Sequence, residues 1–285
     1  MRKTLLSLKK LHALVRHFFE KVSQNQQTIK RVGQFPYRLG EIPMRDLCSS
    51  FEFKEFEFFR GKVRFIQPKQ HRLSIVEILF VSNLKGIKKG GIIADLGAGF
   101  GALSILIALK FNCKVLAVEK DQTMLKLLRH NIKNNSLEDK IEVLESDVRE
   151  INLKLKPQSV SCVVINPPFY PEVKSIKANP YHTELEGNLK DFLKSASYIL
   201  KDGGFLNLLI PSYRLLEACN IMQSLNIQPA YLKFFHSFVD KNSKIVRIAG
   251  VKNLNPKLVV ENPMIINHKE NKYTQEVWEI LERFL

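Results

Sequence analysis

Long hydrophobic runs, closely spaced cysteines and acidic residues are all scarce in this sequence, and each shortage excludes a class of protein. The apolar stretch over residues 91–111 is interrupted by Asp95 and several glycines. It therefore lacks the roughly 20 uninterrupted apolar residues that span a bilayer. The chain has 285 residues, of which 45% are hydrophobic, and this is enough to build a sizeable core. We expect a globular protein without a membrane span.

The four cysteines are too scattered to form a recognisable site. They are Cys48, Cys113, Cys162 and Cys219, and no two of them form a C-x-x-C pair. This spacing matches neither a zinc site nor a disulfide framework, and Cys113 and Cys162 lie among strand-like apolar residues. We predict buried free thiols in a reducing compartment, and no bound metal.

The first residues, MRKTLLSLKKLHALV, are basic like the start of a secretory signal, but Lys9 and Lys10 interrupt the apolar stretch. No small-residue cleavage site follows. Because no acid precedes Glu20, an organelle transit peptide remains an alternative. We expect a cytoplasmic protein.

Acidic residues are outnumbered by basic ones, 28 against 44, which gives a formal net charge of +16. This excess favours a polyanionic partner such as RNA or DNA, although a solvated basic surface is the alternative. Within residues 1–50, ten lysines and arginines face three acids. Residues 4–22 carry leucine, valine and phenylalanine at helical spacing, which predicts a basic amphipathic helix. The helix could pack on the main domain, contact nucleic acid or lie on a membrane surface. The glycines and prolines over residues 33–43 indicate a domain boundary near residue 50.

From about residue 90, apolar strands alternate with helices. This pattern predicts a doubly wound α/β domain with a mostly parallel sheet that is covered on both faces. Ligands of such folds lie beyond the carboxyl ends of the strands. The predicted strands are 91–96, 114–119, 140–146, 160–165, 205–210, 230–235 and 245–252, with helices over 102–111, 121–134, 188–200 and 212–225 and a turn at Gly203-Gly204.

The sequence DLGAGFG follows the first of these strands. Its glycines allow a close backbone approach to a ligand, at the N-terminus of the next helix. The spacing G-x-G-x-G differs from the dinucleotide fingerprint, which argues against a nicotinamide-dependent oxidoreductase. The Asp95 carboxylate would repel phosphate but attract a cationic amino group. Glu119, at the end of the second strand, suits the two hydroxyls of a ribose, and Asp147, after the third, suits an adenine amine.

These features resemble the class I S-adenosylmethionine-dependent methyltransferases over residues 90–210. The resemblance implies a Rossmann-like, seven-stranded sheet and S-adenosylmethionine as the cofactor. The implied cofactor-binding residues are Asp95, Gly97, Ala98, Gly99, Gly101, Glu119, Lys120, Asp147, Val148 and Asn166.

The fourth strand runs directly into Asn166, Pro167, Pro168 and Phe169. This rigid segment suits methylation of a planar exocyclic amine, whose lone pair is delocalised into a ring. The Asn166 side-chain oxygen and the Pro167 carbonyl can accept hydrogen bonds from the two N–H groups of this amine. Held out of the ring plane, these groups leave the lone pair free to react. Proline fixes φ, so the carbonyl direction is set before substrate arrives. Phe169 can stack on the base. A simple turn after the strand is the alternative reading.

The N-P-P-F sequence resembles the (N/D/S)-P-P-(Y/F) motif of amino-methyltransferases, which act on adenine in DNA and RNA, guanine in rRNA, and glutamine in release factors. Residues 58–285 are similar to the bacterial tRNA1(Val) adenine-37 N6-methyltransferases, notably in KVRFIQPKQHRLSIVEILFVSNL, VRIAGVKN and the terminal PMIINHKENKYTQEVWEILERFL. This similarity implies a methyltransferase domain over 51–285, with an antiparallel C-terminal hairpin and a last helix. Val76 stands where that family carries an aspartate, so no role is assigned to the neighbouring Glu77.

The predicted function is therefore transfer of a methyl group to N6 of adenine 37 in tRNA1(Val). A DNA adenine, an rRNA base, a protein glutamine and a non-catalytic RNA-binding module remain alternatives. The expected partners are tRNA and the methyl donor, with no membrane and no metal, and a monomer is favoured. Candidate substrate contacts are His71, Arg72, Tyr170, Lys174, Lys177 and His182.

Overall fold

The computed structural model describes residues 53–68, 72–167, 188–270 and 272–284. The predicted extension over residues 1–50 lies outside these ranges and stays a prediction. The same holds for His71, Pro168, Phe169, Tyr170, Lys174, Lys177 and His182.

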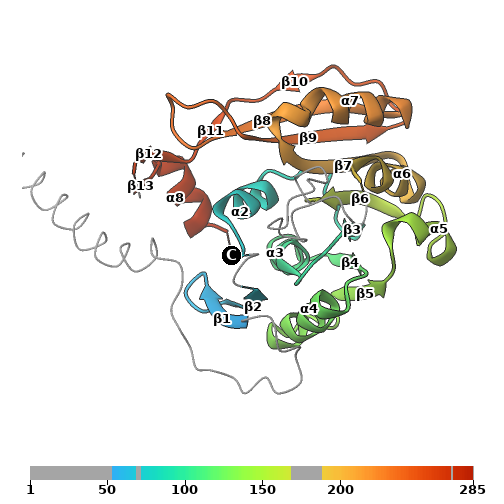
Figure 1. Cartoon of the computed structure of the whole chain (residues 1–285), viewed down its shortest axis with the longest axis horizontal. Coiled ribbons are helices and arrows are strands. Elements are labelled where there is room, and N and C mark those ends of the chain that lie inside the picture. Colours follow the sequence, from blue (N-terminus) through green and yellow to red (C-terminus); the bar gives the residue numbers. More distant parts are fainter. Residues whose placement is uncertain (1–52, 69–71, 168–187, 271, 285) are drawn as a thin grey trace, which may run out of the picture. The chain divides into compact units, whose positions relative to one another are not determined.

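A nine-stranded sheet forms the centre of the described part of the chain (Figure 1). Its order is β10-β8-β9-β7-β6-β3-β4-β5, and β11 pairs with β8. The five neighbouring strands β5, β4, β3, β6 and β7 are mutually parallel. Strand β9 is antiparallel to both β7 and β8. The predicted mostly parallel sheet and its antiparallel C-terminal hairpin are confirmed. The strands are β3 (Ile92–Leu96), β4 (Lys114–Glu119), β5 (Ile141–Glu145), β6 (Val160–Ile165), β7 (Leu200–Pro211), β8 (Ile227–His236), β9 (Ile245–Lys252), β10 (Val259–Val260) and β11 (Met264–Ile265).

Helices cover both faces of this sheet, which is why its central strands are apolar throughout. One core contains buried side chains of α2, α3 and α4, and the other contains side chains of α5, α6 and α7. Successive strand residues enter opposite cores: Ile93 lies in the first and Ala94 in the second. The helices are α2 (Ile75–Ser82), α3 (Ala102–Phe111), α4 (Gln122–Asn134), α5 (Ile151–Lys154), α6 (Leu189–Ile199), α7 (Leu215–Ser224) and α8 (Gln275–Glu282), with short 3-10 turns η1 (Val148–Glu150) and η4 (Ser212–Arg214) and a small strand pair β12 (Asn267–Lys269) and β13 (Lys272–Tyr273).

The predicted turn at Gly203-Gly204 is wrong, because β7 runs through both glycines. Val160 of β6 pairs with Leu200, and Cys162 pairs with Phe205, so the extra residues of β7 form a bulge between these two positions. Gly203 has a φ of 69°, which a residue with a side chain rarely adopts. The glycine therefore serves a bulge within a strand rather than a turn before one.

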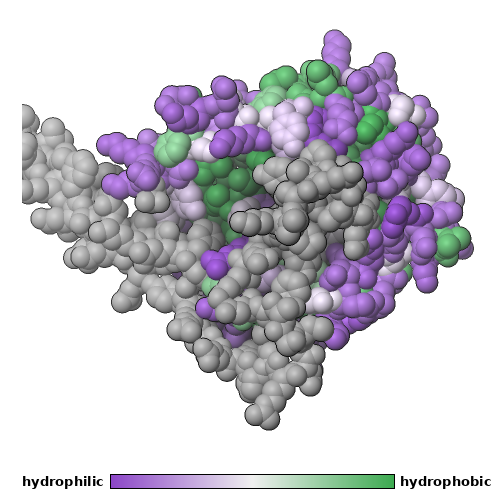
Figure 2. Space-filling view, viewed as in Figure 1, coloured by the Kyte–Doolittle hydropathy of each residue, from purple (hydrophilic) through white to green (hydrophobic). Residues whose placement is uncertain are grey.

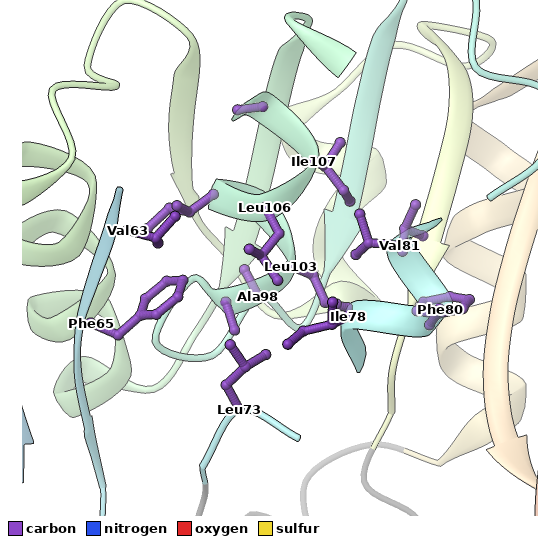
Figure 3. Close-up of a cluster of buried hydrophobic side chains, with 14 of the residues drawn as sticks. Val63, Phe65, Leu73, Ile78, Phe80, Val81, Ala98, Leu103, Leu106 and Ile107 are labelled. Carbon is purple, nitrogen blue, oxygen red and sulfur yellow. The ribbon is translucent and has the colours of Figure 1, made fainter. Parts of the chain in front are cut away.

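A hairpin of β1 (Phe53–Phe58) and β2 (Val63–Pro68) precedes the sheet and was not predicted as strands. The Phe65 ring packs edge-on against Phe100, with 5.9 Å between centroids, beside the apolar side chains of α2 and α3 (Figure 3). The buried Asn131 side chain on α4 accepts from the Ile66 amide at 2.7 Å and donates to the Ile66 carbonyl at 2.9 Å. The hairpin is thus fastened to the first core by both apolar packing and hydrogen bonds.

The described surface is mostly hydrophilic, with apolar side chains gathered at its upper edge in Figure 2, over α7 and β10. Exposed apolar residues there include Leu216, Val259 and Val260. Among the described helices, none has the length and apolar character needed to cross a membrane.

A buried cation, Arg247, lies on β9. The Arg247 side chain is fully buried and forms an ion pair with Glu261 through its Nη2 atom. Lys85 Nζ contacts the other carboxylate oxygen of Glu261 at 2.7 Å. Within the described ranges, Nε and Nη1 of Arg247 have no hydrogen-bond partner. Glu261 therefore carries most of the compensation for this charge.

We expect Glu261→Ala to lower the free energy of unfolding by about 3 kcal/mol, because it leaves a buried guanidinium without a counter-charge. Urea denaturation measures this loss. Glu145→Ala is the control, because Glu145 and its partner Arg129 are 49% and 52% exposed and such pairs contribute little. Equal effects of the two substitutions would refute the assigned role of Glu261.

Candidate active site

The predicted site residues on four neighbouring strands lie at one edge of the sheet. Asp95 of β3 pairs in register with Ala117 of β4 and Val164 of β6. Glu119 pairs with Glu145 at the end of β5, and Asp147 follows two residues later. Asn166 comes directly after β6. The edge therefore collects these side chains, as the parallel strand pattern predicted.

The glycine-rich loop after β3 has three residues in the left-handed region. The φ angles of Gly97, Gly99 and Gly101 are 77°, 57° and 93°. A Cβ at Gly101 would lie 2.6 Å from Leu128 Cδ1, so a side chain there would meet α4. The N-cap residue of α3 is Gly101, which has no side chain to cap the helix that begins directly after it. The loop is therefore compact, and its N-cap residue supplies no side-chain acceptor to the first turn of α3.

Asp95 is 1% exposed and has one satisfied oxygen and one unsatisfied oxygen. Its Oδ2 accepts from the Ser104 hydroxyl at 2.6 Å. Its Oδ1 is buried and, among the described residues, has no partner. Burial raises the pKa of Asp95 to about 7, and the nearby Glu119 and Glu77 carboxylates contribute to this rise. A cationic group bound at Oδ1 would stabilise the ionised form.

Glu119 holds the glycine loop against the end of β4. Its Oε2 accepts from the Gly99 amide at 2.7 Å. Its Oε1 accepts from the amides of Lys120 and Asp121 at 2.8 and 2.9 Å. Burial raises the pKa of Glu119, and these three backbone bonds oppose the rise. Besides the ribose role predicted from the sequence, Glu119 thus has a structural one.

We expect Glu119→Ala to weaken binding of a ligand at the loop by about tenfold or more, because three backbone donors lose a charged acceptor. Calorimetry measures the affinity, and hydrogen exchange of the Gly99 amide reports whether the loop has loosened. Glu142→Ala, which removes an exposed carboxylate on β5, is the matched control. Unchanged affinity and unchanged Gly99 protection would contradict this expectation.

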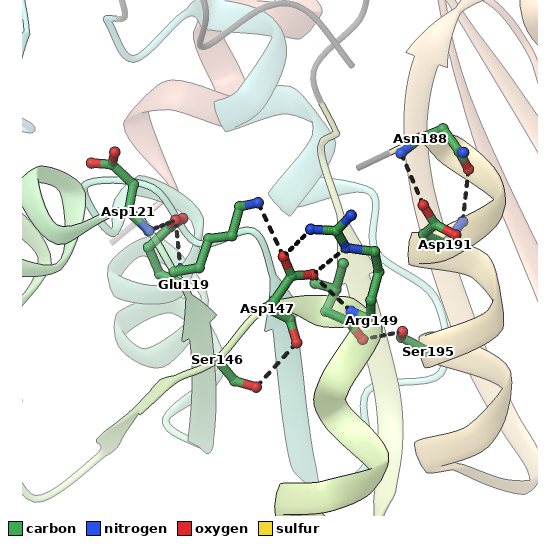
Figure 4. A network of polar contacts seen from close by, with 10 residues as sticks. Glu119, Asp121, Ser146, Asp147, Arg149, Asn188, Asp191 and Ser195 are labelled. Carbon is green, nitrogen blue, oxygen red and sulfur yellow. Dashed lines mark hydrogen bonds and ion pairs between the residues drawn. The ribbon is translucent and has the colours of Figure 1, made fainter. Parts of the chain in front are cut away.

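Asp147 lies between two cationic side chains at the end of β5 (Figure 4). Arg149 donates to both of its oxygens, at 2.9 and 2.6 Å, and Lys120 Nζ lies 3.0 Å from Oδ2. The Arg149 guanidinium, followed by the Arg149 amide and Lys120, holds the pKa of Asp147 well below its usual range. An adenine amine bound here would share Asp147 with these two cations. Val148, predicted beside it, is buried.

Asn166 is held on one side only. Its Nδ2 donates to Glu77 Oε1 at 3.0 Å, whereas its Oδ1 is buried and has no partner in the part of the chain that is described. Pro167 is buried. Burial raises the pKa of Glu77, while its bonds to Ser74 and Asn166 lower it. The sequence contained a signal for Glu77, the capping-box spacing Ser74-x-x-Glu77, but this signal predicts only a helix start.

Other predicted residues lie where they add less to the site. Arg72 is exposed, with its guanidinium carbon 5.8 Å from the Phe56 ring centroid. Cys113 and Cys162 are buried free thiols, as predicted, whereas the free thiol of Cys219 is only partly buried. Burial raises the pKa of Cys162 to about 12, so this thiol stays protonated at neutral pH.

The chain matches the family model "Methyltransferase small domain" over residues 71–226, which is more than half of its length. This chain belongs to the methyltransferase small domain family. It is a class I S-adenosylmethionine-dependent methyltransferase, and the predicted fold and methyl donor are confirmed. The match includes the glycine loop, Glu119, Asp147 and Asn166.

Comparisons with individual proteins agree with this assignment. The chain is 24% identical over 199 residues to a tRNA1(Val) (adenine(37)-N6)-methyltransferase from Cytophaga hutchinsonii, covering 67% of this methyltransferase and 81% of the relative. It is 30% identical over 145 residues to a tRNA (guanine(37)-N(1))-methyltransferase from Methanocaldococcus jannaschii, covering 44% and 42%. A crystal structure of a predicted O-methyltransferase from Agrobacterium tumefaciens superposes with a TM-score of 0.61 at 22% identity, covering 73% and 96%. The last similarity shows the shared fold.

Proposed function

We propose that this methyltransferase transfers a methyl group to N6 of an adenine in tRNA, specifically adenine 37 of tRNA1(Val). One observation carries the proposal: the site contains two buried oxygens without partners in the described ranges, Asp95 Oδ1 and Asn166 Oδ1, at the same sheet edge. Buried acceptors are normally satisfied, so both oxygens suit bound groups that donate hydrogen bonds. The first suits a cationic amino group, and the second suits a neutral amine.

The residues present fit S-adenosylmethionine, which supplies an electrophilic methyl group on a sulfonium when bound. Asp95 would bind its ammonium group, and the left-handed glycines let the loop backbone approach it closely. Glu119 still has acceptor capacity for a ribose hydroxyl beyond its three backbone bonds. Asp147 would accept from the adenine amine of the donor. Asp95 and Glu119 would also balance the positive charge of the donor.

Asn166 and Pro167 would prepare the target nitrogen. The Asn166 Oδ1 and the Pro167 carbonyl oxygen would accept hydrogen bonds from its two N–H groups and turn these groups out of the ring plane. The lone pair would then be free to take the methyl group as its bond to sulfur breaks, which leaves S-adenosylhomocysteine, and the proton released from the nitrogen would pass to water. Pro167 fixes its own φ, so its carbonyl needs little reorganisation. Phe169 would stack on the displaced base and offset part of the cost of unstacking it.

Two further observations support tRNA as the substrate class. Relatives that methylate tRNA according to their names match two thirds of the chain. The net charge of +16 suits phosphate neutralisation, and the basic residues 1–50 would add contacts that do not depend on sequence.

The test incubates the protein with S-adenosylmethionine labelled in its methyl group and with separate pools of unmodified tRNA, rRNA, DNA and protein. We expect label in tRNA, in N6-methyladenine at position 37. An unmodified tRNA1(Val) transcript should be labelled, whereas the same transcript with guanine at position 37 should not. Label in DNA, rRNA or protein alone would contradict the proposal. Failure to bind the donor in calorimetry would instead support a non-catalytic RNA-binding module.

A further inference from the structure

The Glu77 carboxylate lies at the N-terminus of α2 and faces Asn166. It is 7% exposed, and both of its oxygens accept hydrogen bonds. Its Oε2 accepts from the Ser74 amide at 2.7 Å and from the Ser74 hydroxyl at 2.9 Å. Its Oε1 accepts from Asn166 Nδ2 at 3.0 Å. With three donors directed at it, the carboxylate acts as a hydrogen-bond acceptor at both oxygens, and these bonds oppose the rise in its pKa that burial causes.

Because Glu77 Oε1 accepts in this contact, it holds the nitrogen end of the Asn166 amide, which is the donor end. The two ends of a side-chain amide point in different directions, and holding the nitrogen therefore leaves the oxygen facing elsewhere. That oxygen is the one without a partner in the described ranges. The contact with Glu77 thus decides which end of Asn166 faces the substrate.

We propose that Glu77 is a positioning residue that sets the hydrogen-bond polarity of the site. By holding the Asn166 nitrogen, it presents an acceptor to the substrate and selects a target group with N–H donors over a carbonyl group. This inference rests on the proposed amine methylation and deepens it. Glu77 does not touch the reacting atoms, because its oxygens contact Ser74 and Asn166.

The position of Glu77 is fixed by the core rather than by the site. Ser74 and Glu77 form a capping box, in which the Glu77 amide also donates to Ser74 Oγ at 3.4 Å. The next residues of α2, Ile78 to Val81, are buried, and Figure 3 shows Ile78 and Val81 directed toward the apolar side chains of α3. A helix anchored in this way keeps the Glu77 carboxylate in one place.

The same contact explains why residue 166 is asparagine rather than aspartate. An aspartate would put an oxygen 3.0 Å from Glu77 Oε1, where Nδ2 now lies. Two carboxylates at this distance repel each other, and one of them must take up a proton. Asn166 and Glu77 therefore act as a complementary pair, in which the amide donates and the carboxylate accepts.

Variants that place an amide at position 77, a carboxylate at position 166, or both, test whether Glu77 and Asn166 act as a pair. In Glu77→Gln, the Ser74 amide keeps the Gln oxygen, so the Gln nitrogen faces Asn166 and forces its amide to turn. The site then presents N–H groups instead of an oxygen, and we expect kcat to fall about 100-fold, as on loss of one preorganised hydrogen bond. Asn166→Asp should lose activity by repulsion from Glu77. In the double variant, the Gln nitrogen donates to one Asp oxygen and the other faces the substrate, so kcat should recover at least about tenfold.

The midpoint of thermal unfolding should stay close to the wild-type value in all three variants, which shows that each is folded. Polarity itself is read with RNA stem-loops that carry adenosine or inosine at the target position, because inosine has a carbonyl in place of the amine. The wild-type protein should bind the adenosine stem-loop at least about tenfold more tightly, and Glu77→Gln should lose or reverse this preference. An unchanged preference in a folded Glu77→Gln protein, or no recovery in the double variant, would overturn the proposal.

A measurement on the wild-type protein separates this inference from the proposed function. The side-chain amide protons of Asn166 should exchange slowly with water, because a buried carboxylate holds the nitrogen. Exchange at the rate of a solvated amide would refute the role of Glu77, even if tRNA is methylated. Slow exchange without adenine methylation would leave Glu77 in its role but reject the proposed function.

Discussion

Asn166→Ala is expected to lower kcat for methyl transfer about 10²- to 10³-fold, which corresponds to about 3–4 kcal/mol of transition-state stabilisation. The substitution removes the acceptor that the buried site directs at the target amine. The loss should persist at saturating donor concentration, because Asp95 and the glycine loop are unaltered. Single-turnover kinetics with labelled donor and unmodified tRNA measures the methyl-transfer step separately from binding and release.

Asn134→Ala is the matched control for this substitution. Asn134 is an exposed asparagine at the end of α4, and its side chain bonds to Glu55. Its replacement should leave kcat unchanged. If Asn166→Ala binds the donor and transfers methyl at the wild-type rate, the assigned role of Asn166 is wrong.

Asp95→Asn is expected to stabilise the folded protein while it abolishes tight donor binding. The folded pKa of about 7 lies above the usual value of 3.8, so the folded state holds its proton more tightly than the unfolded state. Ionisation of the buried Asp95 therefore lowers the free energy of unfolding. This loss is absent below the unfolded pKa, grows as pH rises between the two pKa values and is complete above about pH 7. This difference amounts to about 4 kcal/mol. The neutral amide introduced by Asp95→Asn carries no such cost, but its oxygen can still accept from Ser104.

The same titration predicts how donor binding depends on pH. The ionised Asp95 binds the cationic amino group, so wild-type affinity should rise up to about tenfold per unit as pH approaches 7 from below, and then level off. Calorimetry at pH 6, 7 and 8 measures this slope. Burial also raises the pKa of Glu119, so Asp95→Asn serves as the reference that isolates Asp95. The expectation fails if Asp95→Asn binds the donor as tightly as the wild type, or if denaturation at pH 8 shows no gain in stability.

Much of the site was predictable because its residues follow strands. An apolar run bounded by glycine or proline predicts a buried strand, and parallel strands bring their carboxyl ends to one edge. Asp95, Glu119, Asp147 and Asn166 could therefore be assigned to the same edge before any contact was known. The partners of these side chains could not. The amides that bind Glu119 and the cations that bind Asp147 depend on how the loops turn after each strand.

The sequence by itself determined the order of the elements, the parallel sheet and the edge at which the chemistry occurs, because periodicity and strand ends are local properties. The tertiary structure alone decided that Glu77 holds Asn166, that Arg247 depends on Glu261 and that Gly203 lies in a bulge. Glu77 and Asn166 are 89 positions apart, and no local pattern links them. Their contact forms only because α2 and β6 are fixed in the same core, and that contact determines which end of an amide meets the substrate.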